Sequence, residues 1–234
     1  MQKRILANGS LEPISKKPCL NQKPCLDKKP NLYIKHNALS KELLNRAHTL
    51  FFKSENIQYL SPEENRVLIY GEYKEVPRKQ AVYSVPGGLS YNFSGTCLKA
   101  RDESEVPLLK EIRQEIEKIV TQDLVATRGQ LVTGGQFNFA FINYYETGQN
   151  TIGWHADDER DMVDGAMIAS ISFGATRDFD FRLKTNHDMK HREVLKDNTL
   201  CLMLFPTNKE WQHSLPKRTK CNEPRVNITF RLFK

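Results

Sequence analysis

The sequence predicts a mainly β protein of the α+β class, a β-sandwich or jelly roll supported by helices near its N-terminal side. Two observations predict this fold. Apolar residues recur with helical spacing only in the first half of the chain, and short strand patterns crowd the second half. The length of 234 residues suits one large domain that can bury a substantial core.

The chain opens with a basic leader, residues 1–31, which holds four prolines and no apolar periodicity. We expect these residues to form a disordered tail and residues 32–234 to form the domain. Seven basic and two acidic residues give the leader a net charge of +5, out of +7 for the whole chain, which leaves only +2 for the domain. The domain therefore has no large overall field for phosphate, and nucleic-acid binding would need individually placed cations together with the tail.

Several features of the leader leave its role open. The tetrapeptide Lys-Pro-Cys-Leu occurs at residues 17–20 and 23–26, without a nearby His or further Cys that would make a metal site. Paired lysines could serve nuclear import or non-specific DNA binding, and a simple solvated leader is an equal alternative. Residues 1–6 suggest a short motif for a partner, such as a replication-associated protein.

Composition excludes some classes of protein. We find no apolar run long enough to span a membrane, and Met1–Ser10 lacks the apolar core of a secretory signal. Five cysteines at scattered spacings argue against a disulfide framework and favour a reducing compartment. We therefore expect a protein that does not associate with membranes, and a monomer.

Two helices are expected early in the domain. Residues 40–53 begin with a serine suited to an N-cap, followed by apolar residues at helical spacing. Residues 106–120 repeat this spacing, with Pro107 near the start, where proline is tolerated. Strand patterns lie at Arg66–Tyr73, Ala81–Val85, Phe137–Tyr145, Met167–Phe173, Phe179–Leu183, Thr199–Phe205 and Arg225–Phe233.

Two of these strands have an unusual polar face. With period two, the face of Phe137, Phe139 and Phe141 turns polar at Asn143 and Tyr145. The last strand places Arg225, Asn227, Thr229 and Arg231 on one face and only apolar residues on the other. A half-exposed strand would explain this alternation, but two arginines flanking an amide and a hydroxyl could also line an anion pocket, because guanidinium groups bind carboxylates in bidentate fashion.

Between these strands lies the sequence His155-Ala156-Asp157. In an extended segment residues i and i+2 point the same way, so this imidazole and this carboxylate can converge on one ion. His213 is the natural third ligand, and two histidines with one carboxylate form the facial set of non-haem Fe(II) oxygenases. The tripeptide alone is common, so the specificity comes from the order of the polar strand, the tripeptide, the histidine and the arginine-lined strand.

The residues from Val67 to Phe233 resemble the AlkB family of nucleic-acid dealkylases, nearest to the animal nuclear form that repairs double-stranded DNA and next to a form that prefers single strands and RNA. The segments that carry the resemblance are Val76–Ala81, Leu89–Gly95, Phe137–Phe139, Asn143–Gly148, His155–Glu159, Ala169–Phe179 and Pro224–Arg231.

The resemblance implies a double-stranded β-helix, with a nucleotide-recognition part at residues 32–135 and a catalytic jelly roll at 136–234. It implies Fe(II) held by His155, Asp157 and His213. It also implies that 2-oxoglutarate is held by Asn143, Tyr145, Arg225, Asn227, Thr229 and Arg231. In the implied reaction O₂ and 2-oxoglutarate give succinate, CO₂ and an Fe(IV)-oxo species, which hydroxylates the N-alkyl carbon so that an aldehyde is released.

The implied substrates are DNA bases alkylated on ring nitrogens, such as 1-methyladenine, 3-methylcytosine and etheno adducts, flipped out of a duplex. By the same resemblance the substrate-binding residues are Tyr91, Phe93, Ser94, Asp158, Glu159, Ile69, Tyr70 and Gly71. Phe93 would stack the base against His155, and the hairpin finger at residues 67–71 would fill the vacated space. Tyr70 stands where the duplex-type relative has phenylalanine; the alternative is that Leu68 and Tyr70 pack in the core.

The remaining basic residues and histidines have simpler predicted roles. Candidate phosphate contacts are Arg78, Lys79, Arg182, Lys184, Lys217, Arg218 and Lys220. We expect residues 121–135 to form a surface loop, His187 and His191 to lie in a strand-gripping loop rather than a second metal site, and His36 and His48 to be structural. Two alternatives stay open: the same chemistry on single-stranded DNA, RNA or protein, and a non-catalytic reader of damaged DNA. The expected compartment is the nucleus.

Overall fold

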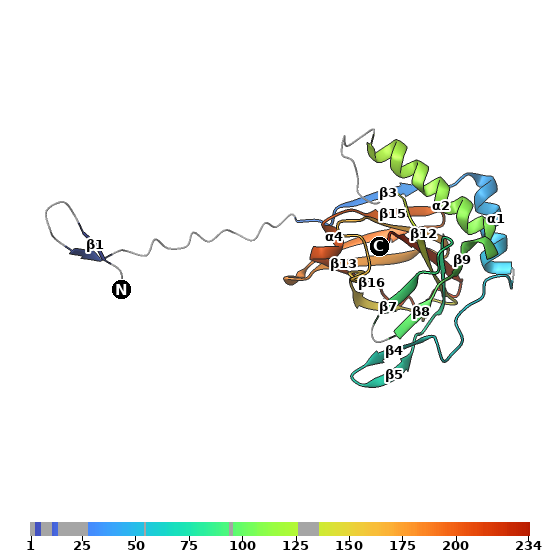
Figure 1. The fold of residues 1–234 in the computed structure, drawn as a ribbon, viewed down its shortest axis with the longest axis horizontal. Coiled ribbons are helices and arrows are strands. Elements are labelled where there is room, and N and C mark those ends of the chain that lie inside the picture. The colour runs from blue at the N-terminus through green and yellow to red at the C-terminus, as the bar shows by residue number, and fades with distance from the viewer. Residues whose placement is uncertain (1–2, 6–10, 14–27, 54, 94–95, 126–135) are drawn as a thin grey trace.

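Two sheets that face each other form the body of the protein in the computed structural model, which describes residues 3–5, 11–13, 28–53, 55–93, 96–125 and 136–234 (Figure 1). In spatial order the larger sheet contains β3 (Leu32–His36), β15 (Thr199–Met203), β12 (Ile168–Gly174), β17 (Arg225–Arg231), β10 (Phe139–Tyr145), β6 (Lys79–Ser84) and β9 (Arg101–Asp102). The smaller sheet contains β11 (Ile152–His155), β16 (Trp211–Leu215), β13 (Arg177–Leu183) and β14 (Asn186–Leu195). This arrangement is a jelly roll and confirms the predicted fold class.

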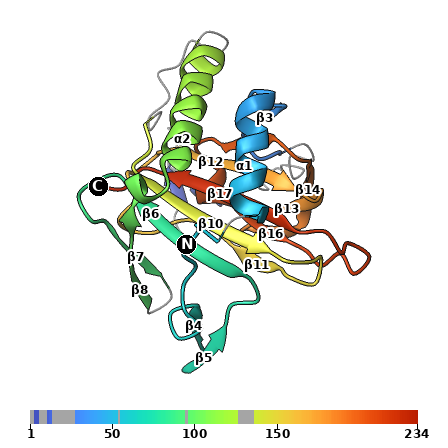
Figure 2. The same ribbon diagram turned by 90° about the vertical axis from the view of Figure 1, so that its right-hand side faces the viewer.

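Two helices cover the outer face of the larger sheet (Figure 2). The first, α1 (Lys41–Lys53), begins where the Ser40 hydroxyl accepts a hydrogen bond from the Leu43 amide at 3.2 Å, so Ser40 caps it as predicted. The second, α2 (Pro107–Ile119), has its proline in the first turn. Both helices bury their apolar stripes in one core with the larger sheet. No helix among the described residues is long and apolar enough to cross a membrane.

The alternation of each strand in the larger sheet divides the core in two. On β17 the apolar side chains of Val226, Ile228 and Phe230 pack toward the helices. The opposite face of the sheet looks into the space between the two sheets, where Phe141 of β10 shares a second core with Phe181 of β13. The polar face of β17 therefore also lies between the sheets, and it is buried.

Short hairpins and helical turns complete the chain. The hairpins are β1 (Lys3–Ile5) with β2 (Leu11–Pro13), β4 (Arg66–Ile69) with β5 (Glu72–Glu75), and β7 (Ser90–Phe93) with β8 (Thr96–Lys99). The helical turns are η1 (Glu103–Glu105), the π-helical η2 (Val120–Val125) and α4 (Thr207–Glu210).

The structure corrects three expected elements. The single strand predicted over residues 66–73 is wrong, because a turn at Tyr70-Gly71 divides it into the hairpin β4–β5. The expected loop around His187 and His191 is instead the long strand β14. The loop expected from residue 121 begins as η2, because Asp123 accepts hydrogen bonds from the side chains of Tyr33 and Lys35, both at 2.6 Å; residues 126–135 lie outside the described residues.

The N-terminal boundary also differs from the expected one. Asn31 already belongs to the domain, since its carbonyl accepts hydrogen bonds from the Leu204 amide at 3.0 Å and the Thr207 hydroxyl at 2.9 Å. Within the tail, β1 and β2 pair antiparallel, which differs from the expected absence of structure. The rest of the tail up to residue 27 lies outside the described residues.

Candidate metal and cosubstrate site

The three predicted metal ligands meet at one end of the smaller sheet. His155 ends β11 and His213 lies in β16, and the register makes these two residues direct cross-strand partners. Asp157 follows two residues after His155, and its backbone is held by the side-chain amide of Asn208, whose oxygen accepts from the Asp157 amide at 3.0 Å. Ligand atoms of all three side chains lie within 4.8 Å of one another.

The geometry of the three side chains suits a divalent ion. The Nε2 atoms of His155 and His213 lie 3.6 and 3.7 Å from the two carboxylate oxygens of Asp157. His155 Nδ1 lies 2.9 Å from the Gly153 carbonyl oxygen, so Nδ1 carries the proton and Nε2 is left with a lone pair toward the cluster. Two imidazoles and one carboxylate on one side of an ion form the facial set that leaves positions for a chelating cosubstrate.

Arginine keeps the aspartate ionised. Burial alone would raise the pKa of Asp157, but electrostatic attraction, chiefly to the Arg231 guanidinium group, outweighs it and lowers the pKa to about 2. Arg231 lies 2.9 Å from one Asp157 oxygen and, through its other terminal nitrogen, 2.8 Å from Glu159. Burial, reinforced by the nearby His155, lowers the pKa of His213 to about 3 and keeps this imidazole neutral, as a metal ligand must be.

A row of polar residues crosses the larger sheet opposite the metal ligands. The register pairs Tyr145 with Arg225 and Asn143 with Asn227 across β10 and β17. These pairs are formed by strands about 80 residues apart in the sequence. Asn227 donates to the Ser170 hydroxyl at 2.8 Å, and its side-chain oxygen accepts from the Thr229 hydroxyl at 3.2 Å. The structure thus brings together all six residues predicted to hold 2-oxoglutarate.

Arg225 is the residue whose surroundings point to an anionic ligand. It is 2% exposed, and one terminal nitrogen donates to the Ser172 hydroxyl at 2.8 Å. Among the residues that the structure describes, no carboxylate pairs with Arg225 and its buried Nε has no hydrogen-bond acceptor. Burial lowers its pKa to about 10, which reflects the cost of an uncompensated buried charge. A bound carboxylate would supply the missing partner, so these residues fit 2-oxoglutarate.

Both groups of residues line one cavity of about 600 Å³ between the sheets. The cavity wall also includes Gln80, Trp154, Phe179 and Met203. A space of this size is sufficient for a metal, a small dicarboxylate and part of a substrate. The chemistry of the donor set fits Fe(II), since two nitrogen ligands and one oxygen ligand face the cavity beside Arg225, which has no carboxylate partner in the described part of the chain.

Glu159 and Asp158, both predicted to bind substrate, line two different cavities. Glu159 lines the cavity, but its carboxylate is nearly buried and pairs with Arg231. Asp158 has a 68% exposed side chain, pairs with Lys184 at 3.2 Å and lines a neighbouring cavity of about 550 Å³. The side chains of Tyr91, Phe93 and Ile69, and the whole of Ser94, lie outside the described part of the chain.

The hairpin β4–β5 presents its tip to solvent. Tyr70 and Gly71 form a two-residue turn with positive φ angles of 51° and 81°, the values of a type I′ turn. Tyr70 is 100% exposed and Leu68 is 39% exposed, so the alternative that both residues pack in the core is wrong. The tip also adjoins the site, since Val67 and Lys74 of the same hairpin line the cavity.

Most candidate phosphate contacts have protein partners. The guanidinium group of Arg182 lies 4.6 Å from the centre of the Trp154 ring and its Nε donates to Gln212 at 2.8 Å. Arg218 pairs with Asp178. Lys79 lies 5.5 Å from the centre of the Tyr144 ring. Lys217 and Lys220 are exposed.

Arg78 differs most from its expected role. Its side chain lines the cavity and donates from Nε to the Asn143 oxygen at 2.7 Å and from a terminal nitrogen to the Thr151 carbonyl at 3.2 Å. Arg78 therefore supports a residue of the predicted cosubstrate site, which the basic sequence Arg78-Lys79 did not indicate.

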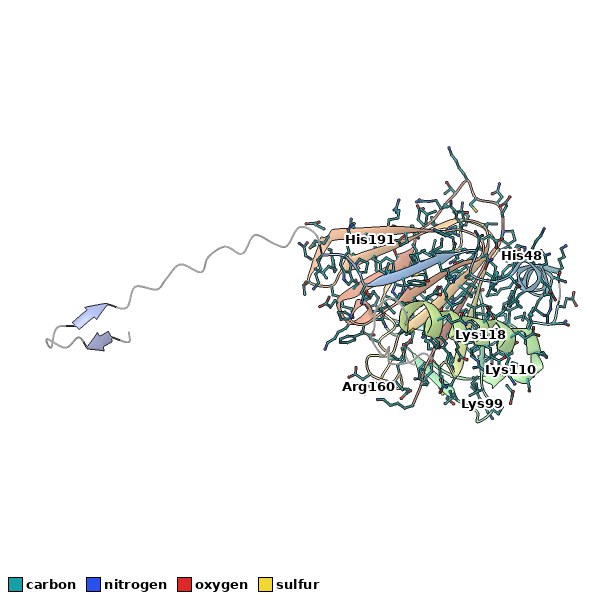
Figure 3. All side chains as sticks on the ribbon, turned by 90° about the horizontal axis from the view of Figure 1, so that it is seen from above. His48, Lys99, Lys110, Lys118, Arg160 and His191 are labelled. Atoms are coloured by element: carbon teal, nitrogen blue, oxygen red, sulfur yellow. The ribbon has the colours of Figure 1, made fainter. Side chains whose placement is uncertain are left out.

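The remaining histidines are separate from this site. Among the residues that the structure describes, His155, Asp157 and His213 form the single cluster able to hold a metal. His191 pairs with Glu193 at 2.6 Å, His48 pairs with Asp197 at 2.8 Å, and His36 contacts the Thr199 hydroxyl at 3.1 Å. Figure 3 shows His48 and His191 on opposite sides of the domain. The structural roles predicted for His36 and His48 suit these contacts.

Sequence reasoning missed Gln80, Ser170 and Ser172, which also face the site. A signal for them exists. Gln80 is a polar residue next to an apolar run, and the two serines alternate with Ile171 and Phe173 in a strand with no other polar residues. The alternation shows that they share a face, but not that this face is the one opposite the metal ligands.

Comparison with known proteins agrees with the fold and with the residue set. The chain belongs to the 2OG-Fe(II) oxygenase superfamily, which matches residues 31–231. This superfamily takes its name from Fe(II) and 2-oxoglutarate, the metal and the cosubstrate that the residues of the cavity suit.

Within that superfamily, the similar proteins include AlkB homologues, which confirms the resemblance seen in the sequence. The DNA oxidative demethylase ALKBH2 of Bos taurus is 42% identical over 182 residues, which cover 75% of this chain and 60% of the relative. The Homo sapiens ALKBH2 is 41% identical over 182 residues, 75% of this chain and 64% of its own length. The Homo sapiens alpha-ketoglutarate-dependent dioxygenase alkB homolog 3 is 34% identical over 163 residues, 66% of this chain and 51% of its own. The chain thus spans less than two thirds of each of these relatives.

Solved structures support the fold alone. The structure of OsALKBH1 matches with a TM-score of 0.53 at 15% identity, covering 88% of this chain and 99% of that one. A Pseudomonas putida prolyl-4-hydroxylase matches with a TM-score of 0.50 at 13% identity, covering 88% and 94% of the two chains.

Proposed function

We propose that this protein is a DNA oxidative demethylase that removes alkyl groups from ring nitrogens of bases, with 1-methyladenine, 3-methylcytosine and etheno adducts as substrates. The observation that carries the proposal is one cavity between the sheets in which His155, Asp157 and His213 face Arg225, a buried arginine with no carboxylate partner among the described residues. The similarity to ALKBH2 supplies the substrate class.

The residues of the cavity would have different roles according to their positions. His155, Asp157 and His213 would hold the iron, which when loaded with 2-oxoglutarate and O₂ supplies the oxidising power for hydroxylation of the alkyl carbon. Arg225, with the hydroxyl of Tyr145 and the amides of Asn143 and Asn227, would bind the cosubstrate. Arg231 holds Asp157 ionised and oriented.

The cavity also determines how substrate must arrive. The metal ligands lie between two sheets, with His213 and Asp157 buried, so a base stacked within a duplex cannot reach them. The base must therefore leave the helix before its alkyl carbon can reach the metal ligands. We propose Tyr91, Phe93, Ser94, Asp158 and Glu159 as its contacts; Glu159 would share its carboxylate between the base and Arg231.

An assay of methylated oligonucleotides tests the proposal. With Fe(II), 2-oxoglutarate and O₂, we expect wild-type protein to release formaldehyde and form succinate in step with repair. His155→Ala should lose at least about 1,000-fold of this activity, because the remaining ligands cannot keep the facial set. His191→Ala, which removes a histidine that does not line the cavity, is the matched control. Absence of repair on every methylated strand would overturn the proposal.

We further propose that the duplex is the preferred substrate. The β4–β5 hairpin projects an exposed tyrosine at the tip of a tight turn beside the cavity, and a flat ring there could occupy the space left by a flipped base. Base stacking of this kind contributes about 1–3 kcal/mol per base.

Alanine at Ile69 and Tyr70 tests the duplex preference. Repair of methylated duplex should fall about tenfold or more, while repair of the same lesion in single-stranded DNA should change little. Equal losses of repair on the duplex and on the single-stranded substrate would favour the alternative, a demethylase of single-stranded DNA or RNA. The 34% identity to alkB homolog 3 supports that alternative.

The oligomeric state, the compartment and the basic tail of the protein can also be assigned roles. We propose that it acts as a monomer in the nucleus, and that the basic residues 1–31 bind DNA non-specifically or a replication-associated partner. Fluorescent fusions with and without residues 1–27 would test this; equal nuclear and repair-focus signals would remove any role for the tail.

A further inference from the structure

Gln80 lies at the end of a polar row that crosses the larger sheet. The register aligns Ser172, Asn227, Asn143 and Gln80 on neighbouring strands, and all four side chains are buried on the face toward the metal ligands. Asn227 and Asn143 belong to the proposed cosubstrate site, and Ser172 accepts a hydrogen bond from Arg225 of the same site. Gln80 lies at the other end of this row and lines the cavity together with Val67 and Lys74 of the β4–β5 hairpin, which is proposed to contact the duplex.

The hydrogen bonds determine which way the Gln80 amide points. Arg78 has only donors, so the atom of Asn143 that it contacts at 2.7 Å must be the oxygen. Gln80 contacts the same oxygen at 3.0 Å, so the contacting atom of Gln80 must be its nitrogen. Its oxygen, Oε1, is therefore the group left over. The arginine in this way fixes the donor and acceptor roles of both amides.

This remaining oxygen lacks a donor. Gln80 is 2% exposed and lines the cavity, and among the residues that the structure describes none donates a hydrogen bond to its Oε1. A buried acceptor without a donor is unfavourable, so such a group in a binding cavity points to a ligand. Ionised 2-oxoglutarate has only acceptor oxygens and cannot be that ligand. The ligand must bring an N–H or O–H group.

Bases differ at the position that could supply this donor. Adenine and cytosine carry exocyclic amino groups, whereas guanine and thymine carry carbonyl oxygens at the equivalent sites. We propose that Gln80 is a specificity-determining residue whose Oε1 accepts a hydrogen bond from the amino group of the flipped base. The site would then favour alkylated adenine and cytosine over alkylated guanine and thymine. This inference rests on the proposed function.

The test compares two lesions in the same oligonucleotide, 3-methylcytosine and 3-methylthymine. Wild-type enzyme should repair the first with the higher kcat/KM. Gln80→Met, which keeps the length of the side chain but has no amide, should reduce the ratio of the two kcat/KM values by about tenfold or more. Using the ratio cancels any general loss that results from the missing bond to Asn143.

Two further variants separate selectivity from damage to the site. Gln80→Glu keeps an acceptor but loses the donor to Asn143, so it should retain the lesion preference while raising the KM for 2-oxoglutarate. Ser170→Ala removes a hydrogen bond on the cosubstrate side and should lower repair of both lesions equally. A change in the lesion ratio for Ser170→Ala would contradict an effect specific to Gln80.

Binding supplies a readout without turnover. Enzyme that holds Fe(II) and 2-oxoglutarate, kept under nitrogen so that no turnover occurs, should bind the 3-methylcytosine strand more tightly than the 3-methylthymine strand. Gln80→Met should remove most of this difference in affinity. Unchanged ratios in both assays, with wild-type repair intact, would show that Oε1 binds only a structural water and would overturn this inference alone. A wild-type enzyme that repairs neither lesion would overturn the proposed function, and this inference with it.

Discussion

Arg225 and Arg231 lie at opposite ends of the same face of β17, and both are buried. Arg231 is compensated by Asp157 and Glu159, whereas Arg225 has a hydroxyl partner and no described carboxylate. One arginine thus belongs to the metal side and the other to the cosubstrate side. The same residue type has two roles because its neighbours on other strands differ.

Substitution of each arginine should therefore give a different defect. Arg225→Gln should raise the KM for 2-oxoglutarate by about tenfold or more, because it removes the positive charge that would pair with the cosubstrate carboxylate, while metal affinity changes little. It should also stabilise the cosubstrate-free protein by about 1–3 kcal/mol, since an uncompensated buried charge is removed. Enzyme kinetics and denaturant unfolding measure the two effects; a fall in stability without ligand would contradict this account.

Arg231→Gln should act on the metal instead. Without its guanidinium group the burial of Asp157 is no longer offset, so the pKa of Asp157 should rise and metal affinity should fall about 10- to 100-fold. Titration of the protein with Fe(II) under nitrogen measures the affinity. Glu159→Gln, which leaves the contact of Arg231 with Asp157 in place, is the matched control and should retain most of it.

At the scale of elements, the β4–β5 hairpin combines a tight turn with an unsuitable residue. Tyr70 adopts a positive φ, which bulky side chains adopt only with strain, in a turn type that favours Asn-Gly. An exposed aromatic ring held in a strained turn is more easily explained by contact with a partner than by stability. The hairpin was predicted as a finger from resemblance, and its exposed tip suits that role.

Tyr70→Asn should separate stability from function at this turn. Relief of the strained φ should stabilise the hairpin by about 1 kcal/mol, while duplex repair should fall because the ring is lost. Amide hydrogen exchange at Ile69 and Glu72, the pair that flanks the turn, measures the local stability. Gly71→Ala at the next position, where φ is 81°, should have the opposite effect on exchange.

A close approach between two loops positions the metal-binding strand. The Gly148 amide donates to the Cys221 carbonyl at 2.7 Å and the Arg218 amide donates to the Gly148 carbonyl at 2.9 Å. A Cβ at Gly148 would collide with the backbone oxygen of Arg218. Gly148→Ala should therefore separate the loop before β11 from the loop before β17, destabilise the protein by about 1–3 kcal/mol and lower activity. Gly153→Ala, which has open space around it, should not destabilise it.

At the scale of the whole molecule, the site joins the two sheets. The smaller sheet supplies His155 and His213, and the larger sheet supplies Asn227, Arg225 and Arg231. Iron and 2-oxoglutarate would bind between them, so their binding energy adds to the packing that holds the sheets together. Folding stability should therefore depend on loading.

Thermal unfolding should show this dependence. Fe(II) and 2-oxoglutarate together, under nitrogen and at about 100 times their dissociation constants, should stabilise the protein by about 2.7 kcal/mol or more and raise Tm. Removal of the metal with a chelator should reverse the shift. His155→Ala should show almost no shift, and an equal shift in that variant would place the metal elsewhere.

Much of this architecture follows from the sequence. The helical spacing within residues 40–53 and 106–120 predicted α1 and α2 closely, since an amphipathic stripe determines which face is buried. The alternation of Arg225 through Arg231 predicted which residues share a face. The order of the polar strand, the tripeptide at residues 155–157, His213 and the arginine-lined strand predicted metal chemistry, because two histidines and one carboxylate form the facial set of non-haem iron.

The tertiary structure alone decided the rest. Periodicity shows which residues share a face but not whether water reaches it, so a half-exposed strand remained an alternative until the polar face of β17 was found between the sheets. The contact of His155 with His213 depends on strands paired by packing across a long stretch of chain. For the same reason Arg78, predicted to contact phosphate, supports Asn143 instead, and Gln80 went unnoticed. Burial and cross-strand register are properties of the assembled sheets, and no local stretch of sequence contains them.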